Sequence, residues 1–193
     1  MPTKVIDGGY DGGDTPVAIG IDQSLTGFAL TALVIDQPKT FYTWIYKSPY
    51  NGIERLVDIR QWLKDHLSYI DERSYIADIA MEGTVLASQA ALVLGELSAT
   101  VRMTIYDYFE DERRFPLKVP PMTLKKFAAG KGNAKKQEML LQIYKRWGIE
   151  FNDDNAADSY ALARLASGTG IDKIETMIID QMKDLKYRDQ VRD

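Results

Sequence analysis

The pattern of hydrophobic and polar positions divides the chain into short apolar runs and longer helical repeats. Runs rich in β-branched and aromatic residues, closed by turn residues, predict five strands, at 17–22, 27–35, 39–47, 75–82 and 114–120. Apolar residues that recur every three or four positions predict helices, at 53–70, 87–109, 122–128, 134–147 and within 151–166. This order predicts an α/β fold with a five-stranded mixed sheet and helices on both faces.

Length and composition limit the domain organisation. The chain has 193 residues, of which 45% are hydrophobic and 27% charged, and this suits one folded domain, predicted at residues 16–168. Residues 1–15 hold four glycines and three aspartates and predict a flexible tail, whereas residues 169–193 predict an amphipathic helical extension. Because no apolar run of about 18 residues and no signal-peptide core is present, we expect a cytoplasmic protein without a membrane partner.

Few residue types are available for metal binding. Cysteine is absent and His66 is the one histidine, which excludes disulfides, thiolate chemistry and histidine-rich metal sites. Any metal must then be held by oxygen ligands, which favours magnesium, manganese or calcium.

Charge is distributed unevenly along the chain. The net charge is −4, yet residues 113–146 hold ten lysines and arginines against a single acid, Glu138. A basic surface beside an acidic site suits phosphodiester chemistry, while a solvated basic face is the alternative explanation.

Three acids occupy positions from which one site could form. Asp22 closes the first predicted strand in "GIDQSLTG", and Glu82 closes the fourth in "IAMEG". Asp158 lies near the start of a helix, on its apolar face. Carboxylates brought together in a part-buried site repel each other unless divalent cations lie between them. Two magnesium ions held by these acids could activate a water and stabilise the leaving oxygen of a phosphodiester.

The basic segment has features of a phosphate site. In "LKKFAAGKGNAKKQEM", Gly130 and Gly132 permit a tight turn and Asn133 can cap the following helix, whose first N–H groups can receive a phosphate. The Gly-Lys-Ser/Thr ending of a Walker loop is missing, so we expect no nucleotide cofactor. We predict DNA contacts from six lysines, Lys118, Lys125, Lys126, Lys131, Lys135 and Lys136. A solvated, lysine-rich turn is the alternative.

Four sequence motifs occur along the chain in this order: "IGIDQSLTGFAL", "IAMEG", "TLKKFAAGKGNAKKQEM" and "NAADSYALA". Together they resemble the RuvC-type Holliday junction resolvases of the RNase H-like nuclease superfamily. The resemblance implies a homodimeric endonuclease that nicks opposite strands of a four-way DNA junction and uses two magnesium ions per active site, with manganese as a substitute. It assigns metal binding and catalysis to Asp22, Glu82 and Asp158, and it matches Lys125 and Lys136 to functional lysines, with a catalytic role for Lys136.

The last motif departs from the family pattern, which is Asp-x-x-Asp. Asn155 stands where the first of those acids is expected. At 100° per residue, Asp154 lies about 40° around the helix from Asp158, Asn155 about 60° and Asp153 about 140°. Asp153 therefore suits a helix cap, Asp154 is the preferred fourth metal ligand, and Asn155 is the neutral alternative. A divergent last motif suits a bacteriophage member, which would work on nucleoid DNA in the cytoplasm of its host.

Two functions are consistent with these sequence features. The first is a metal-dependent junction resolvase, and the second is a junction- or flap-binding protein with weak or no catalysis because its last motif is incomplete. The long helix predicted at 87–109 is apolar on more than one side, which indicates two packing partners. One is the sheet, and by the resemblance the other is a second subunit; a monomer in which the C-terminal helix covers this face is the alternative.

Overall fold

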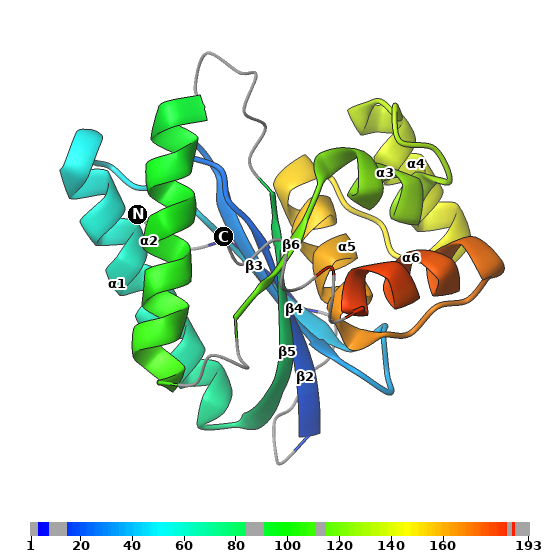
Figure 1. Ribbon diagram of the computed structural model, residues 1–193, viewed down its shortest axis with the longest axis horizontal. Helices are drawn as coiled ribbons and strands as arrows, with labels where there is room; N and C mark the ends of the chain where they lie inside the picture. Colours follow the sequence, from blue (N-terminus) through cyan, green and yellow to red (C-terminus); the bar gives the residue numbers. More distant parts are fainter. Residues whose placement is uncertain (1–3, 8–14, 84–90, 111–114, 185–186, 188–193) are drawn as a thin grey trace.

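A six-stranded mixed sheet separates two layers of helices in the computed structural model, which describes residues 4–7, 15–83, 91–110, 115–184 and 187 (Figure 1). The strands are β1 (Lys4–Asp7), β2 (Thr15–Asp22), β3 (Phe28–Val34), β4 (Phe41–Tyr46), β5 (Ser74–Glu82) and β6 (Leu117–Val119). The helices are α1 (Gly52–Asp71), α2 (Ala91–Phe109), α3 (Pro121–Ala129), α4 (Lys136–Trp147), α5 (Asp154–Ser167) and α6 (Lys173–Lys183).

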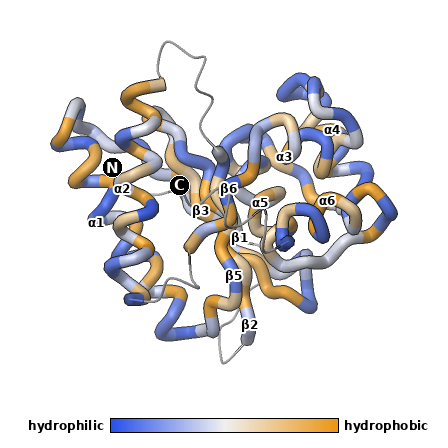
Figure 2. The backbone as a smooth tube through the Cα atoms, in the orientation of Figure 1, coloured by the Kyte–Doolittle hydropathy of each residue, from blue (hydrophilic) through white to orange (hydrophobic). Residues whose placement is uncertain are grey.

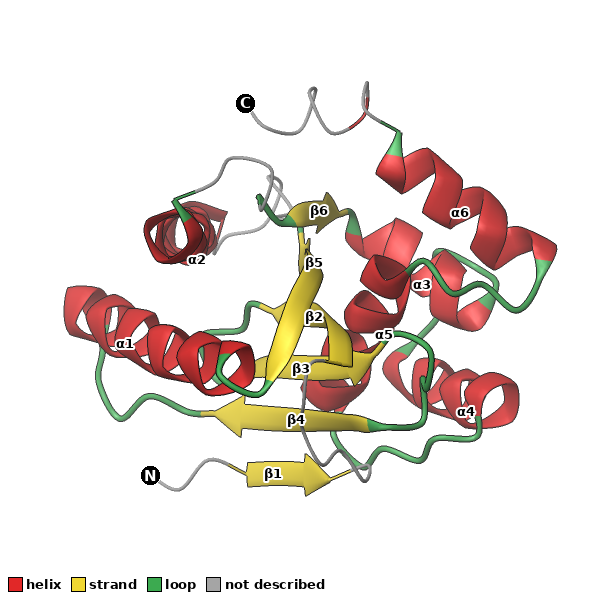
Figure 3. Cartoon of the chain, turned by 90° about the horizontal axis from the view of Figure 1, so that it is seen from below, coloured by secondary structure: helices red, strands yellow, loops and turns green. Residues whose placement is uncertain are grey.

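The strand order across the sheet is β1-β4-β3-β2-β5-β6. The pairs β1·β4, β4·β3 and β3·β2 are antiparallel, whereas β2·β5 and β5·β6 are parallel. Helices α1 and α2 cover one face, and α3, α4, α5 and α6 cover the other (Figure 3). The predicted α/β fold is confirmed, with all five predicted strands in a mixed sheet and helices on both faces.

The N-terminal segment differs from the prediction of a flexible tail over residues 1–15. Its residues Lys4–Asp7 form β1, which pairs with β4 from Lys4 opposite Ile45 to Asp7 opposite Tyr42. The prediction is therefore wrong for these residues. Without β1, β4 would be an edge strand with unpaired N–H and C=O groups, and a short extended segment can pair with such groups whatever its own composition.

Alternate residues of the central strands face two separate hydrophobic cores. On β2, Val17, Ile19 and Ile21 belong to the core under α1 and α2, whereas Ala18 belongs to the core under α5. On β5, Met81 faces the first core and Ala80 the second. Since side chains alternate along a strand, the residue after Ile21 and the residue after Met81 both face α5.

Helices α2 and α6 pack on opposite faces of the sheet. Helix α2 buries Leu97, Val101 and Ile105 against the core that it shares with α1, and the predicted start of this helix at 87–90 lies outside the described residues. Helix α6 buries Ile178 and Met182 and packs against α3, α5 and β6, on the opposite face of the sheet from α2. Helix α6 therefore does not cover α2, and the part of the extension after Asp184 lies almost wholly outside the described residues. Within the described part of the chain, no helix is long and apolar enough to cross a membrane.

Candidate active site

The carboxyl ends of β2 and β5 bring two acids together. Ile21 pairs with Met81 in the parallel register, so Asp22 and Glu82, the next residue of each strand, lie beside each other at one edge of the sheet. Both side chains lie on the face that α5 covers, because they alternate with Ile21 and Met81, which face the other core. The sequence prediction that these two strand ends converge is consistent with this register.

A close approach of α5 to β2 supplies the third acid. Gly20 lies under α5, where a Cβ atom would overlap the backbone oxygen of Ser159 and the backbone nitrogen of Ala163. The Ser159 hydroxyl hydrogen-bonds to the Thr31 hydroxyl of β3 over 2.8 Å and thereby fixes the helix on the sheet. Asp158 immediately precedes Ser159 and so comes next to the strand-end acids.

Burial shifts the pKa of all three carboxyls upward, and repulsion from neighbouring acids adds to the shift of Asp22 and Asp158. Burial raises the pKa of Asp22 well above its usual range, and the charges of Glu82 and Asp158 raise it further. Burial also raises the pKa of Asp158 to about 7, with a further contribution from Glu82. For Glu82, burial raises the pKa while the nearby charge of Lys125 lowers it. Such a set of carboxylates is held in its charged form most easily by added positive charge.

The start of α5 separates the candidates for a fourth ligand. Asp153 caps the helix by accepting a hydrogen bond from the Ala156 backbone N–H at 3.1 Å, as predicted. The Asp154 carboxylate accepts a hydrogen bond from Lys136, which lowers its pKa, and the charge of Asp154 raises the pKa of Asp22 and Asp158. The Asn155 side chain lies against Gly27 in the turn after β2. This placement favours Asp154 over Asn155 as the fourth oxygen donor.

Two of the six predicted lysines face the carboxylates. Lys125 of α3 and Lys136 at the start of α4 line a narrow cavity together with Asp154 and Asp158. The charge of Lys125 lowers the pKa of Glu82 and Asp158, and that of Lys136 lowers the pKa of Asp22 and Asp158. These two are also the lysines that the family resemblance singles out.

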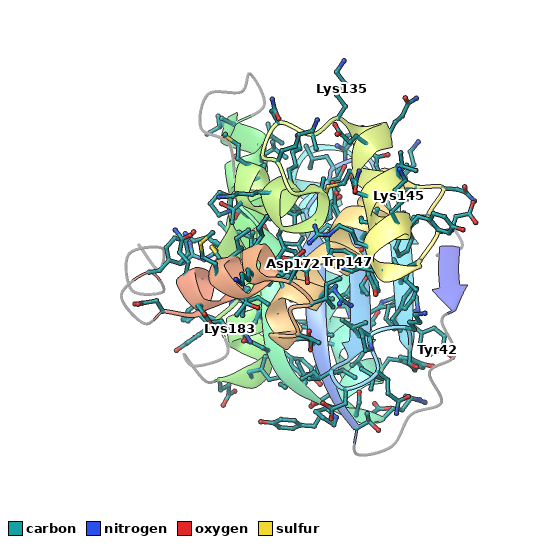
Figure 4. The ribbon with its side chains drawn as sticks, turned by 90° about the vertical axis from the view of Figure 1, so that its right-hand side faces the viewer. Tyr42, Lys135, Lys145, Trp147, Asp172 and Lys183 are labelled. Atoms are coloured by element: carbon teal, nitrogen blue, oxygen red, sulfur yellow. The ribbon has the colours of Figure 1, made fainter. Side chains whose placement is uncertain are left out.

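The other predicted lysines lie outside this cavity. Lys126 and Lys135 are exposed, and Lys135 points away from the body of the protein (Figure 4). Lys131 is exposed and forms an ion pair with Glu138 at 2.7 Å, and Lys118 is part-buried on β6. The turn between α3 and α4, which carries Lys131 and Lys135, is strongly hydrophilic (Figure 2). The structure therefore brings Lys125 and Lys136 to the carboxylates and leaves the other four lysines outside the cavity wall.

Sequence reasoning missed Gln23, the residue that follows Asp22. Gln23 is 6% exposed, and its Nε2 donates a hydrogen bond of 2.6 Å to the backbone oxygen of Glu82. Its Oε1 is buried, and no described residue donates a hydrogen bond to it. Gln23 therefore ties the two acid-bearing strand ends together. The sequence feature that could have indicated it is the position of Gln23, a long polar residue directly after the acid that closes a buried strand.

The residues present fit an oxygen-liganded divalent cation by their chemistry. Among the described residues, no three acids or histidines lie as close together as the ligands of a bound ion. The acids are nevertheless close enough for their charges to raise the pKa of Asp22 and Asp158. Without a cation between them, carboxylates repel each other and stand further apart. The buried, mutually repelling set of Asp22, Glu82 and Asp158 is what a site for such a cation requires, with Asp154 as a further donor.

The fold is similar to that of two solved RuvC structures. RuvC of Thermus thermophilus aligns with a TM-score of 0.61 and 20% sequence identity, over 86% of this chain and 96% of that one. The chain has the RuvC-type fold. Thermus thermophilus RuvC in complex with a Holliday junction substrate also aligns, with a TM-score of 0.56 and 19% identity, over 77% of this chain and 90% of that one. No protein-family model and no curated protein matches the sequence, so the assignment to the RuvC-type fold rests on structure.

Proposed function

We propose that the protein is a metal-dependent endonuclease that resolves four-way DNA junctions by paired nicks. The observation that carries this proposal is the convergence of Asp22, Glu82 and Asp158 from β2, β5 and α5, with Lys125 and Lys136 beside them. The RuvC-type fold supports it, because a solved neighbour with that fold is a complex with a Holliday junction substrate. Branched DNA is therefore the substrate class that we assign to this chain.

In the proposed reaction the acids and the lysines have separate tasks. Asp22, Glu82 and Asp158, joined by Asp154, would hold two magnesium ions, which manganese could replace. When bound, such a pair of ions activates a water for in-line attack and stabilises the leaving 3′-oxygen. Lys125 and Lys136 orient the scissile phosphate, since an ammonium group binds a phosphate as a point charge. Gln23 holds the backbone of Glu82 in place through its hydrogen bond to the Glu82 carbonyl oxygen.

The test is cleavage of matched synthetic substrates with magnesium. A four-way junction, a fork, a flap and a linear duplex of the same sequence are incubated with the protein and with Asp22→Asn. We expect paired nicks in the junction, much slower cleavage of the duplex and none with Asp22→Asn. Equal rates on junction and duplex would refute the structure selectivity, and no cleavage of any substrate would refute the nuclease.

A second candidate function is junction or flap binding without catalysis. The observation in its favour is Asn155 at the position where an acid is expected, beside an Asp154 whose carboxylate is already paired with Lys136. Gel-shift binding of the junction in calcium, together with intact strands in magnesium and in manganese, would favour this function. Cleavage in either metal would exclude it.

The exposed face of α2 supports the proposal of a homodimer. Leu92 and Met103 are 78% and 60% exposed, and a hollow of the same face is walled by Met103, Tyr106 and Phe115. Symmetric nicks need two active sites related by a two-fold axis, and a self-complementary apolar face can provide that axis. We expect sedimentation equilibrium to show a dimer that Met103→Glu converts to a folded monomer. A parent protein that sediments as a monomer at assay concentration would contradict the proposal.

A further inference from the structure

The guanidinium of Arg146 connects the ends of two helices. Arg146 lies in the last turn of α4, and its side chain is 17% exposed. Its Nη1 donates hydrogen bonds to the backbone oxygens of Phe127 and Ala128, at 2.7 and 2.9 Å, in the last turn of α3. These carbonyls have no partner within α3, because the last turn of a helix leaves its C=O groups free. Arg146 therefore caps α3 and ties it to the far end of α4.

The first turn of α6 holds Arg146 in this position. Glu175 is fully buried, and its Oε1 accepts hydrogen bonds from Arg146 Nη2 at 2.6 Å and from Trp147 Nε1 at 2.9 Å. Its Oε2 accepts one from the Ile171 backbone N–H at 2.9 Å. Asp172, which caps α6, also accepts from Arg146 Nη2, and it lies next to Trp147 where α6 meets α4 (Figure 4). A buried carboxylate with three donors is a rigid anchor, since removal of Arg146 would leave its buried charge without a cationic partner.

This anchor bears on the candidate active site through the helices that it joins. Lys125 lies on α3, two residues before Phe127, and Lys136 begins α4, the helix that ends with Arg146 and Trp147. Both lysines line the narrow cavity beside Asp158. The angle between α3 and α4 therefore sets how far apart the two ammonium groups stand. Arg146, held by Glu175, joins the end of α3 to the end of α4 and thereby restricts that angle.

We propose that Arg146 and Glu175 are positioning residues through which α6, in the C-terminal extension, sets Lys125 and Lys136 for one DNA phosphate. This inference rests on the proposed function, since it assigns the extension a part in the handling of DNA by the same site. Neither residue touches the DNA. The extension is thus a component of the site rather than an appendage to the folded domain.

The test compares substitutions in the anchor with a control on the same helix. Arg146→Lys keeps the charge but cannot reach two carbonyls and a carboxylate at once, and Glu175→Gln keeps the shape but removes the charge. The control is Lys183→Ala, because Lys183 fixes the other end of α6 to the backbone oxygen of Ala166 at 2.6 Å and to Asp78. For each protein we would measure the melting temperature, junction binding in calcium against salt concentration, and KM and kcat in magnesium.

All three variants are expected to melt at lower temperature, but only the anchor variants should change DNA handling. A phosphate contact contributes about 0.9 to the slope of log K against log salt, so loss of one or both lysine contacts should reduce the slope by about 1 to 2. We expect about tenfold higher KM for the junction with Arg146→Lys and Glu175→Gln, and parental slope and KM with Lys183→Ala.

Two outcomes would overturn the inference, and one would overturn the proposed function instead. Folded anchor variants with the slope and KM of the parent, or a control that changes them equally, would show that α6 merely stabilises the fold. If both anchor variants fail to fold, Asp172→Asn removes only the more exposed partner of Arg146 and must still lower the slope. A parent protein that neither binds nor cuts the junction would contradict the proposed function without involving α6.

Discussion

The acids and the lysines of the candidate active site are held in the protein by different means. Asp22 ends a strand buried on both faces and is 5% exposed, whereas the Lys136 side chain is 80% exposed and starts a helix on the surface. The acids are positioned by strand register and by close packing of α5, both of which tolerate little movement. The lysines are positioned by the orientation of α3 and α4, which Arg146 joins through hydrogen bonds at the end of α4 remote from Lys136. Changes to the acids should therefore affect chemistry and stability, and changes to the lysines should affect the salt dependence of binding.

The largest expected effect is on chemistry alone. Glu82→Gln removes one charge from the set of acids while its backbone can still accept the hydrogen bond from Gln23. We expect a loss of junction cleavage on the order of 1,000-fold or more, with binding in calcium within about threefold of the parent. Single-turnover cleavage and gel-shift titration measure the two quantities. An equal loss of binding would show that the acids and lysines are not separable.

The next effect is on the packing that brings Asp158 to the strands. Gly20→Ala places a methyl group against backbone atoms of Ser159 and Ala163, so α5 must move away from β2. Overpacking of this kind costs about 3 kcal/mol of unfolding free energy. Urea denaturation measures it, with Gly95→Ala in α2 as control, because a Cβ atom there meets nothing within 4 Å. A Gly20→Ala protein as stable as the parent would mean that α5 does not need this close contact.

A smaller effect comes from protonation of Asp158. Its pKa is raised to about 7, so the folded protein retains a proton at pH values where the unfolded chain has lost it. The contribution of this group to stability is therefore greatest in acid and falls as pH rises from about 4 to about 7. Asp158→Asn has no carboxyl to ionise, so its stability should exceed that of the parent by about 1–2 kcal/mol at pH 8 and match it more closely at pH 5.

The same two proteins also test the metal proposal. Ionised acids bind divalent cations, so manganese should raise the melting temperature of the parent more at pH 8 than at pH 6. It should raise that of Asp158→Asn much less at either pH. Circular dichroism melts with and without manganese give the comparison. A parent whose melting temperature is indifferent to manganese at both pH values would argue against a metal site at these acids.

The smallest effect concerns individual lysines. Lys125→Ala and Lys136→Ala should each reduce the salt slope of junction binding by about 1, since each removes one phosphate contact. The control is Lys39→Ala, an exposed lysine between β3 and β4, at the edge of the sheet opposite the acids. A slope that changes as much for Lys39 as for the other two would show that the net charge of the protein, and not this site, determines binding.

The sequence by itself determined five of the six described strands, the main helices and the acids at the strand ends. Apolar runs and helical repeats are local signals, and the ends of two such runs already mark Asp22 and Glu82 as strand-closing acids. Asp153 was predicted as a helix cap for the same reason, because a cap depends on residues within one turn, and the structure confirms it. These features follow from neighbours in the chain, which a sequence displays directly.

Only the tertiary structure decided which distant residues meet. The pairing of β1 with β4, the fit of Gly20 under α5, the tie from Gln23 to Glu82 and the anchor of Arg146 on Glu175 each join segments far apart in the chain. Helix geometry already preferred Asp154 over Asn155, and the folded chain adds where each side chain lies, the first against Lys136 and the second against Gly27. The hydrophobic pattern shows that a face is buried but not which element covers it, because the hydrophobic effect is nearly non-directional. Hydrogen bonds and close backbone contacts depend on atomic positions, which only the folded chain provides.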